Sequence, residues 1–254
     1  MDINKIDFYY FSGTGNTLLV AREMKKLFDK HGIQTRLLAI EKEAPRNIDK
    51  DASIILAFPV AVFTTYPLVM KFIKGMPQSE GAKVFMVDTM GGASLGIRSY
   101  IGGLLRSKGY RTMAARQIVM PDNFWPSPEK DLKNPAIINK AMNVAQKYAK
   151  DIIDGKTNWG VFPVLPSLIY ITSQLLFKTK GFRTAVKFTQ SKCVKCGLCA
   201  KLCPIKNIVL REYPVFDSRC ELCMRCIAYC PKGAIYRRGE GEHVYRGVKP
   251  EELL

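Results

Sequence analysis

The C-terminal part of the chain contains the same cysteine spacing twice. The pattern C-x2-C-x2-C-x3-C-P begins at Cys193 and returns at Cys220. An apolar pair follows each proline, at 208–209 in the first copy and at 234–235 in the second. The first residues of the chain contain Asp2 and Asp7 and no long apolar core, so no signal peptide is predicted. Eight cysteines in such a chain predict metal ligation in a reducing compartment rather than a disulfide framework.

Three thiolates spaced by two residues wrap one corner of an iron–sulfur cubane, and in two-cluster proteins the fourth ligand comes from the other motif. The spacing therefore predicts two [4Fe-4S] clusters. One would be held by Cys193, Cys196, Cys199 and Cys230, and the other by Cys203, Cys220, Cys223 and Cys226. A zinc site is the alternative, but tetrahedral zinc is held by paired Cys-x2-Cys units and needs no further ligands at this spacing. Residues 189–238 resemble bacterial two-cluster ferredoxins, which implies a small α+β ferredoxin-like domain at 188–254.

The sequence FSGTGNT at 11–17 lies between an apolar run at 6–11 and an amphipathic segment that ends near Gly32. A strand, a tight loop and a helix in this order direct backbone N–H groups and the positive end of the helix dipole at an anion. A P-loop would need Gly-Lys-Ser/Thr at the helix start, and a dinucleotide site would need glycine in place of Leu18. The third alternative is the phosphate of a mononucleotide, bound by Ser12, Gly13, Thr14, Gly15, Asn16 and Thr17.

This loop resembles the FMN loop of the flavodoxin family, Ser/Thr-x-Thr-Gly-Asn-Thr, and the resemblance implies FMN as a cofactor. Further strands are predicted at 34–40, 52–58, 83–88 and 113–120, and a last helix at 136–154. Five strands alternating with helices predict an α/β fold with a doubly wound, five-stranded parallel sheet over 1–155.

In flavodoxin-like proteins the flavin ring lies between the loops that follow the third and fourth strands. The corresponding residues here are Pro59, Val60, Ala61, Val62 and Phe63, and Thr89, Met90, Gly91, Gly92 and Ala93. Phe63 or Tyr66 would lie against the ring, and segment 121–125 would line the same edge. Plain strand–helix turns with one core aromatic are the alternative.

Residues 156–187 are predicted to form a linker. The apolar stretch at 161–177 contains two prolines and is shorter than the roughly twenty residues of a membrane-spanning helix. It is expected to pack against both domains or to form a homodimer contact. Peripheral contact of 161–187 with an anionic membrane, through the basic residues that follow the apolar stretch, is the alternative.

The formal net charge of the chain is +17. Two oxidised clusters and a flavin phosphate would reduce it to about +11. A basic surface predicts an acidic redox carrier protein or reductase as partner, because the field steers their encounter. Nucleic acid is not expected, since the basic residues are spread along the chain without a recognition motif. His31 and His243 stand in no catalytic or ligand pattern.

Together, the two halves resemble the EFR1 family of flavodoxin–ferredoxin fusions over nearly the whole chain. The first hypothesis is an electron-transfer protein that passes single electrons between two clusters and FMN and exchanges them with a redox partner. The clusters predict oxygen sensitivity and an anaerobic or strongly reducing cytoplasm. Ferredoxins of this type are usually acidic, so their usual partners do not carry over to this basic chain. An FMN-dependent reductase of a small organic substrate, with a pocket walled by Phe63, Tyr66, Phe124 and Trp125, is the alternative, although no catalytic residue is identified. A redox sensor is a third hypothesis.

Overall fold

The computed structural model describes residues 3–92, 94, 96–156, 158–160, 166–179, 185–237 and 243–254. Its central sheet consists of β1 (Lys5–Tyr10), β2 (Gln34–Ala39), β3 (Ser53–Pro59), β4 (Lys83–Met90) and β5 (Arg111–Val119). The strand order is β2-β1-β3-β4-β5, and every neighbouring pair is parallel. This is the order of flavodoxin-like doubly wound sheets, so the predicted fold class of this half is confirmed.

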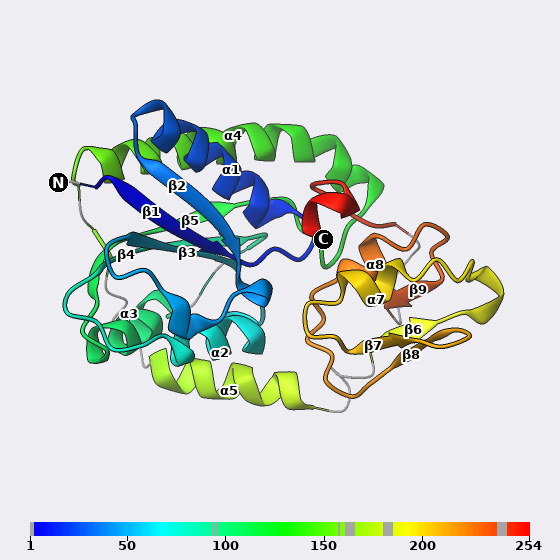
Figure 1. The fold of residues 1–254 in the computed structure, drawn as a ribbon. Coiled ribbons are helices and arrows are strands. Elements are labelled where there is room, and N and C mark those ends of the chain that lie inside the picture. The colour runs from blue at the N-terminus through cyan, green and yellow to red at the C-terminus, as the bar shows by residue number, and fades with distance from the viewer. Residues whose placement is uncertain are drawn as a thin grey trace.

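Helices cover both faces of the sheet (Figure 1). Helices α1 (Asn16–Lys30) and α4 (Pro128–Ile153) lie on one face, and α2 (Pro67–Gly75), α3 (Ile97–Ser107) and α5 (Pro166–Lys178) on the other. Successive side chains of a strand point to opposite faces. Leu56 of β3 therefore packs in the core beneath α2 and α3, whereas its neighbours Ile55 and Ala57 pack beneath α1 and α4. This two-sided burial explains the nearly continuous apolar runs of the strands.

The predicted strands agree with the observed ones to within two residues at each end. The last helix differs, because α4 begins at Pro128 and not after Pro135. Ser127 caps the helix by accepting a hydrogen bond from Lys130 N–H at 3.3 Å, and proline is favourable at the first helical position, where its missing N–H leaves no bond unmade. Pro135 therefore lies inside the helix, and the packing of α4 against α1 maintains the helix through it.

Two small antiparallel sheets form the C-terminal part of the fold. β6 (Val186–Phe188) pairs with β9 (Ile235–Arg237), and β7 (Ile208–Leu210) pairs with β8 (Pro214–Phe216). Two short helices, α7 (Leu198–Leu202) and α8 (Arg225–Ala228), each contain the third cysteine of their motif, and the 3₁₀ helix η4 (Pro250–Leu253) lies at the C-terminus. This α+β unit lies at the carboxyl ends of the parallel strands (Figure 1), the edge at which open α/β sheets bind ligands.

Helix α5 belongs to the segment predicted to be a linker. It packs against α3, and Phe177 is buried beside Tyr66, with 6.0 Å between the ring centroids. Residues 161–165 and 180–184 lie outside the described residues, so the dimer and membrane hypotheses for this segment stay predictions. Within the described ranges, no helix has both the length and the apolar character needed to cross a bilayer.

Candidate functional site

The loop between β1 and α1 buries three hydroxyl side chains, those of Ser12, Thr14 and Thr17. Gly15 is the N-cap residue of α1 and has a φ of 109°, a left-handed conformation that glycine adopts without strain. In the part of the chain that the structure describes, no group accepts a hydrogen bond from the N–H groups of residues 13–17. Consecutive unpaired donors at a helix N-terminus form a binding site for an anion.

The hydroxyl groups of the loop retain protons that they can donate. Ser12 Oγ accepts from Leu18 N–H at 3.4 Å, and Thr14 Oγ1 accepts from Asn123 Nδ2 at 2.9 Å. A hydroxyl that accepts one hydrogen bond still has its own proton for another acceptor. The donor set therefore fits a phosphate group held by N–H and O–H groups rather than by a lysine.

The two loops predicted to flank a flavin ring leave neighbouring strands at this edge. Pro59 of β3 is in register with Thr89 of β4, and Val60 N–H donates to Thr89 O at 2.8 Å. Thr89 Oγ1 also lies 2.8 Å from Thr17 Oγ1, which connects the loop after β4 to the phosphate loop. The structure thus brings 59–63, 89–92 and 12–17 together, whereas Ala93 lies outside the described residues.

Phe63 stands at the tip of a strained turn. Ala61 and Thr64 exchange two backbone hydrogen bonds of 3.0 Å, and Val62 and Phe63 between them have φ values of 51° and 63°. A left-handed φ is unfavourable for a β-branched residue such as Val62, and strain of this kind clusters at ligand-binding turns. The turn leaves the Phe63 side chain 52% exposed, so its ring is available to a ligand.

Tyr66 does not share this position. It is buried, and its ring lies edge-on to Phe11 at 5.4 Å between centroids, within the core beneath α2. The prediction that Tyr66 could lie against a flavin ring is therefore wrong. Its aromatic side chain is needed to fill the space between the sheet and α5.

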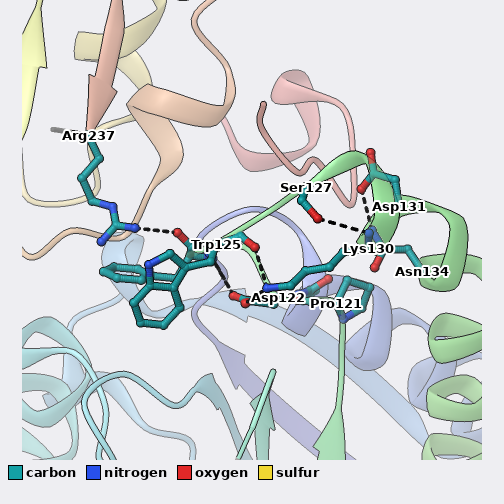
Figure 2. Close-up of polar contacts among 10 residues, drawn as sticks. Pro121, Asp122, Trp125, Ser127, Lys130, Asp131, Asn134 and Arg237 are labelled. Carbon is teal, nitrogen blue, oxygen red and sulfur yellow. Dashed lines mark hydrogen bonds and ion pairs between the residues drawn. The ribbon is translucent and has the colours of Figure 1, made fainter. Parts of the chain in front are cut away.

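The segment after β5 contacts the phosphate loop. Asn16 Nδ2 donates to Pro121 O at 2.8 Å, in addition to the bond from Asn123 to Thr14. Figure 2 shows how this segment is fixed: Lys130 donates to Asp122 at 2.7 Å, and Arg237 reaches from β9 to the backbone carbonyl of Phe124 at 2.8 Å. The Arg237 guanidinium also lies 3.6 Å from the centroid of the Phe124 ring, which covers one face of that ring.

The eight cysteines fall into two groups of four, and each group combines three cysteines of one motif with the last cysteine of the other. The first group lines a cavity of about 20 Å³ and consists of Cys193, Cys196, Cys199 and Cys230. The second group consists of Cys203, Cys220, Cys223 and Cys226, within which the pKa values of Cys220, Cys223 and Cys226 are raised by burial and then by neighbouring thiols. No set of three or more described His, Cys, Asp or Glu side chains has the arrangement of a single-ion site.

The backbone repeats around the two groups. In each motif the first cysteine accepts a hydrogen bond at 3.4 Å from the N–H two residues later, and the last cysteine accepts one at 3.2 Å from the N–H four residues later. The donors after the first cysteines, Lys195 and Leu222, both have a positive φ, which turns their N–H groups back to the sulfur. Hydrogen bonds to sulfur are among the features that set the potential of an iron–sulfur cluster.

Burial raises the pKa of the Cys223 thiol to about 12 and that of Cys199 to about 11. Burial also holds the pKa of Cys226 well above its ordinary value. Such thiols stay protonated at neutral pH unless a metal supplies positive charge, because a coordinating thiol is deprotonated by the ion it binds. The second group is therefore suited to metal ligation and unsuited to free-thiolate chemistry.

The second cysteine group lies directly against the phosphate loop. A Cβ atom added at Gly13 would clash with the carbonyl oxygen of Cys223, so only glycine permits this approach. Arg225, between Cys223 and Cys226, donates from Nε and Nη2 to Ser12 O at 2.9 and 2.8 Å and pairs with the buried carboxylate of Glu41. The carbonyl oxygen of Ser12 thus accepts hydrogen bonds from the protein, while the N–H groups of the loop remain available to a ligand.

Other contacts at this junction involve residues that sequence reasoning did not identify. Tyr229 donates to Thr14 O at 3.1 Å, and Gly247 N–H donates to the same oxygen at 2.7 Å. Glu221 accepts from Leu68 N–H at 3.0 Å, at the N-terminus of α2. The sequence did contain one signal for this junction, because Arg225 and Glu221 are charged residues placed between the cysteines of the second motif. No local pattern identifies the partners.

Comparison with known proteins agrees with this organisation. A family of 4Fe-4S binding domains matches residues 186–209 and 213–236, one match for each cysteine motif. NAD(P)H-quinone oxidoreductase subunit I from Gloeobacter violaceus is 25% identical over an alignment of 116 residues, with a coverage of 37% of this chain and 56% of that protein. The chain therefore spans just over half the length of this relative.

Several flavodoxin structures are also similar. Oxidised flavodoxin 2 from Bacillus cereus is 18% identical, with a TM-score of 0.44 over 58% of this chain and 99% of the flavodoxin. Two-electron reduced flavodoxin from Megasphaera elsdenii is 19% identical, with a TM-score of 0.39 over 57% of this chain and 98% of the flavodoxin. By its strand order the N-terminal sheet is flavodoxin-like, and a pair of 4Fe-4S binding motifs follows it in the chain. This combination supports a role in electron transfer.

Proposed function

We propose that the chain is a flavo-iron-sulfur protein of the EFR1 family that passes single electrons between two [4Fe-4S] clusters and FMN and exchanges them with a redox partner. The FMN phosphate binds the loop at 12–17, and the flavin ring lies between 59–63 and 89–93. Cys193, Cys196, Cys199 and Cys230 hold the first cluster, and Cys203, Cys220, Cys223 and Cys226 hold the second. The protein acts in a reducing cytoplasm.

One observation carries this proposal: the loop that contains Cys223 of the second group is in direct contact with the phosphate loop. The carbonyl of Cys223 approaches Gly13 so closely that no side chain fits between them. Electron transfer slows steeply with distance, so a cluster and a flavin held on two sides of one contact are suited to exchange electrons. FMN supplies the one- and two-electron redox chemistry when bound. The chain itself neutralises the phosphate and holds the two sites at a fixed separation.

The reductase alternative has less support. Of the four residues expected to wall a substrate pocket, Phe63 and Trp125 are exposed. Tyr66 lies in the core, and Arg237 covers Phe124. One of the four expected side chains is therefore absent from the edge where a substrate would meet the ring, and a second has one face covered.

The experiment that tests the proposal compares FMN with riboflavin, which lacks the phosphate. The protein is reconstituted anaerobically with iron and sulfide, and binding of each flavin is followed by quenching of flavin fluorescence. In the wild type, FMN is expected to bind far more tightly than riboflavin. Ser12→Ala with Thr14→Val is expected to reduce that preference by about 10- to 100-fold for each lost charge-assisted hydrogen bond.

Ser107→Ala is the matched control, because Ser107 is exposed at the end of α3 and bonds only the carbonyl of Leu104 among the contacts described. Iron and sulfide content should be equal in all three proteins. Equal affinity of the wild type for FMN and riboflavin would refute the assignment of the loop. A bound flavin that dithionite-reduced clusters fail to reduce would refute electron transfer between the two sites.

A further inference from the structure

We propose that an acidic one-electron carrier protein docks on the rim of the first cysteine group and exchanges electrons there, while the second group relays them to the phosphate loop. The rim is defined by Val194, Lys195, Cys196, Leu210 and Lys232, which line the same cavity as the first group. The proposal rests on the proposed function and adds to it the place at which electrons enter and the chemistry of the partner.

The second cysteine group lies against the sheet domain. Arg225 and Tyr229 lie on either side of Cys226 in the sequence. Both are buried, and they donate hydrogen bonds to the carbonyl oxygens of Ser12 and Thr14 in the phosphate loop. Cys223 packs against the core beneath α2 and against Gly13. The sheet domain therefore covers the side of this group that Cys223 forms.

The first cysteine group faces outward. Cys196 is exposed, whereas the other seven cysteines are partly buried. Val194 and Leu210 beside it are 55% and 42% exposed, and Leu210 lies over Gly197, 3.1 Å from the position of a Cβ atom there. Exposed apolar side chains grouped around a cofactor site are typical of a protein-docking surface.

The charge of the rim indicates an acidic partner. Lys192, Lys195 and Lys232 line the cavity, and no described carboxylate does, although Glu212 pairs with Lys195 at 3.1 Å. Residues 185–237 contain ten Lys and Arg against three Asp and Glu. Such a field raises the encounter rate with an acidic protein by about 10- to 1,000-fold and disfavours a basic one. The apolar side chains between the lysines favour a protein surface over a small anion.

The step proposed is a transfer of one electron. The reduced carrier loses one electron and the oxidised first cluster gains it, with no bond made or broken and no proton required. The test uses the reconstituted full chain and, as probe, a chemically reduced acidic plant-type ferredoxin. Stopped-flow absorption follows bleaching of the clusters at low and at physiological salt, and dithionite serves as a reductant that needs no docking.

Lys195→Gln with Lys232→Gln is expected to slow reduction by the ferredoxin about tenfold at low salt and to leave reduction by dithionite unchanged. Lys133→Gln with Lys140→Gln is the matched control, because it removes the same charge from exposed positions on α4 and should leave both rates unchanged. Equal slowing by both pairs, or slowing by neither, would overturn the proposal.

A measurement on the wild type keeps the proposal testable if the rim variant fails to assemble its clusters. A carbodiimide links carboxylates of the bound ferredoxin to lysines of this chain, and mass spectrometry locates the links. Links at Lys192, Lys195 or Lys232 are expected, and links confined to the sheet domain would overturn the proposal. Neither readout involves flavin, so a failure of FMN binding would leave both results interpretable.

Discussion

Arg225→Met perturbs the buried junction between the two halves of the chain. The side chains of Arg225 and Glu41 are 3% and 6% exposed, and Arg225 also donates two hydrogen bonds to Ser12 O. Removing one partner of a buried pair costs about 3–5 kcal/mol, because the remaining charge stays out of water. For a chain of this length, such a loss lowers Tm by about 10 °C.

A double-mutant cycle separates the ion pair from the other contacts of Arg225. Glu41→Gln removes the buried charge, so Arg225→Met should cost less in that background, and we expect a coupling free energy of about 2 kcal/mol or more. Calorimetry of the anaerobically reconstituted proteins supplies the four values. Arg219→Met is the control, because Arg219 pairs with Asp217 on the surface and should contribute less than about 1 kcal/mol.

Two results would refute this reasoning. Additive costs in the cycle would mean that Arg225 and Glu41 do not interact in solution. If Arg225→Met lowered the free energy of unfolding by less than about 1 kcal/mol, the junction would be hydrated, because leaving a buried carboxylate unpaired costs more than that.

Three further predictions concern single positions. Cys203→Ala should give the reduced paramagnetic resonance spectrum of Cys220→Ala, and a spectrum like that of Cys193→Ala would contradict the crossed grouping. Gly13→Ala should weaken FMN binding and lower Tm, because its methyl group clashes with the Cys223 carbonyl. Gly103→Ala is the control and should do neither, because an added Cβ atom there has no neighbour within 4 Å; equal effects of the two variants would contradict the contact. Burial raises the pKa of Asp88 to about 6, so its ionisation opposes folding. The protonated Asp88 side chain makes its full contribution to the free energy of unfolding below about pH 4, and this contribution falls by about 3 kcal/mol as pH rises through 6. Asp88→Asn should remove this dependence of Tm on pH, and an unchanged dependence would contradict the prediction.

Much of each half could be predicted from the sequence alone. The apolar runs of β1, β3 and β4 predicted strands buried on both faces, and the order of strands and helices predicted the doubly wound sheet. The cysteine spacing predicted two groups of four, and the loop at 12–17 predicted a site for an anion. These features depend on residues that are close in sequence or on a spacing that repeats, so the chain itself carries the signal.

Burial within the sheet domain was predicted less well. Tyr66 and Phe63 are both aromatic residues of the loop after β3, yet Tyr66 fills the core and Phe63 is exposed. The difference arises from the two left-handed residues at the turn, Val62 and Phe63, whose conformation no propensity favours. Only the packed structure decides which ring faces outward.

The junction between the halves was decided by tertiary structure alone. Arg225 bonds Ser12 across 213 positions of sequence, Tyr229 bonds Thr14 across 215, and the tail brings Gly247 to the same carbonyl. Each contact is a hydrogen bond whose partner has no local signature, and each forms only when two independently patterned units meet. Sequence therefore determined what each half is suited to bind, by periodicity and spacing. Tertiary structure determined that the second cysteine group meets the phosphate loop and that the first faces outward, because the free energy of docking is a sum over contacts between distant segments.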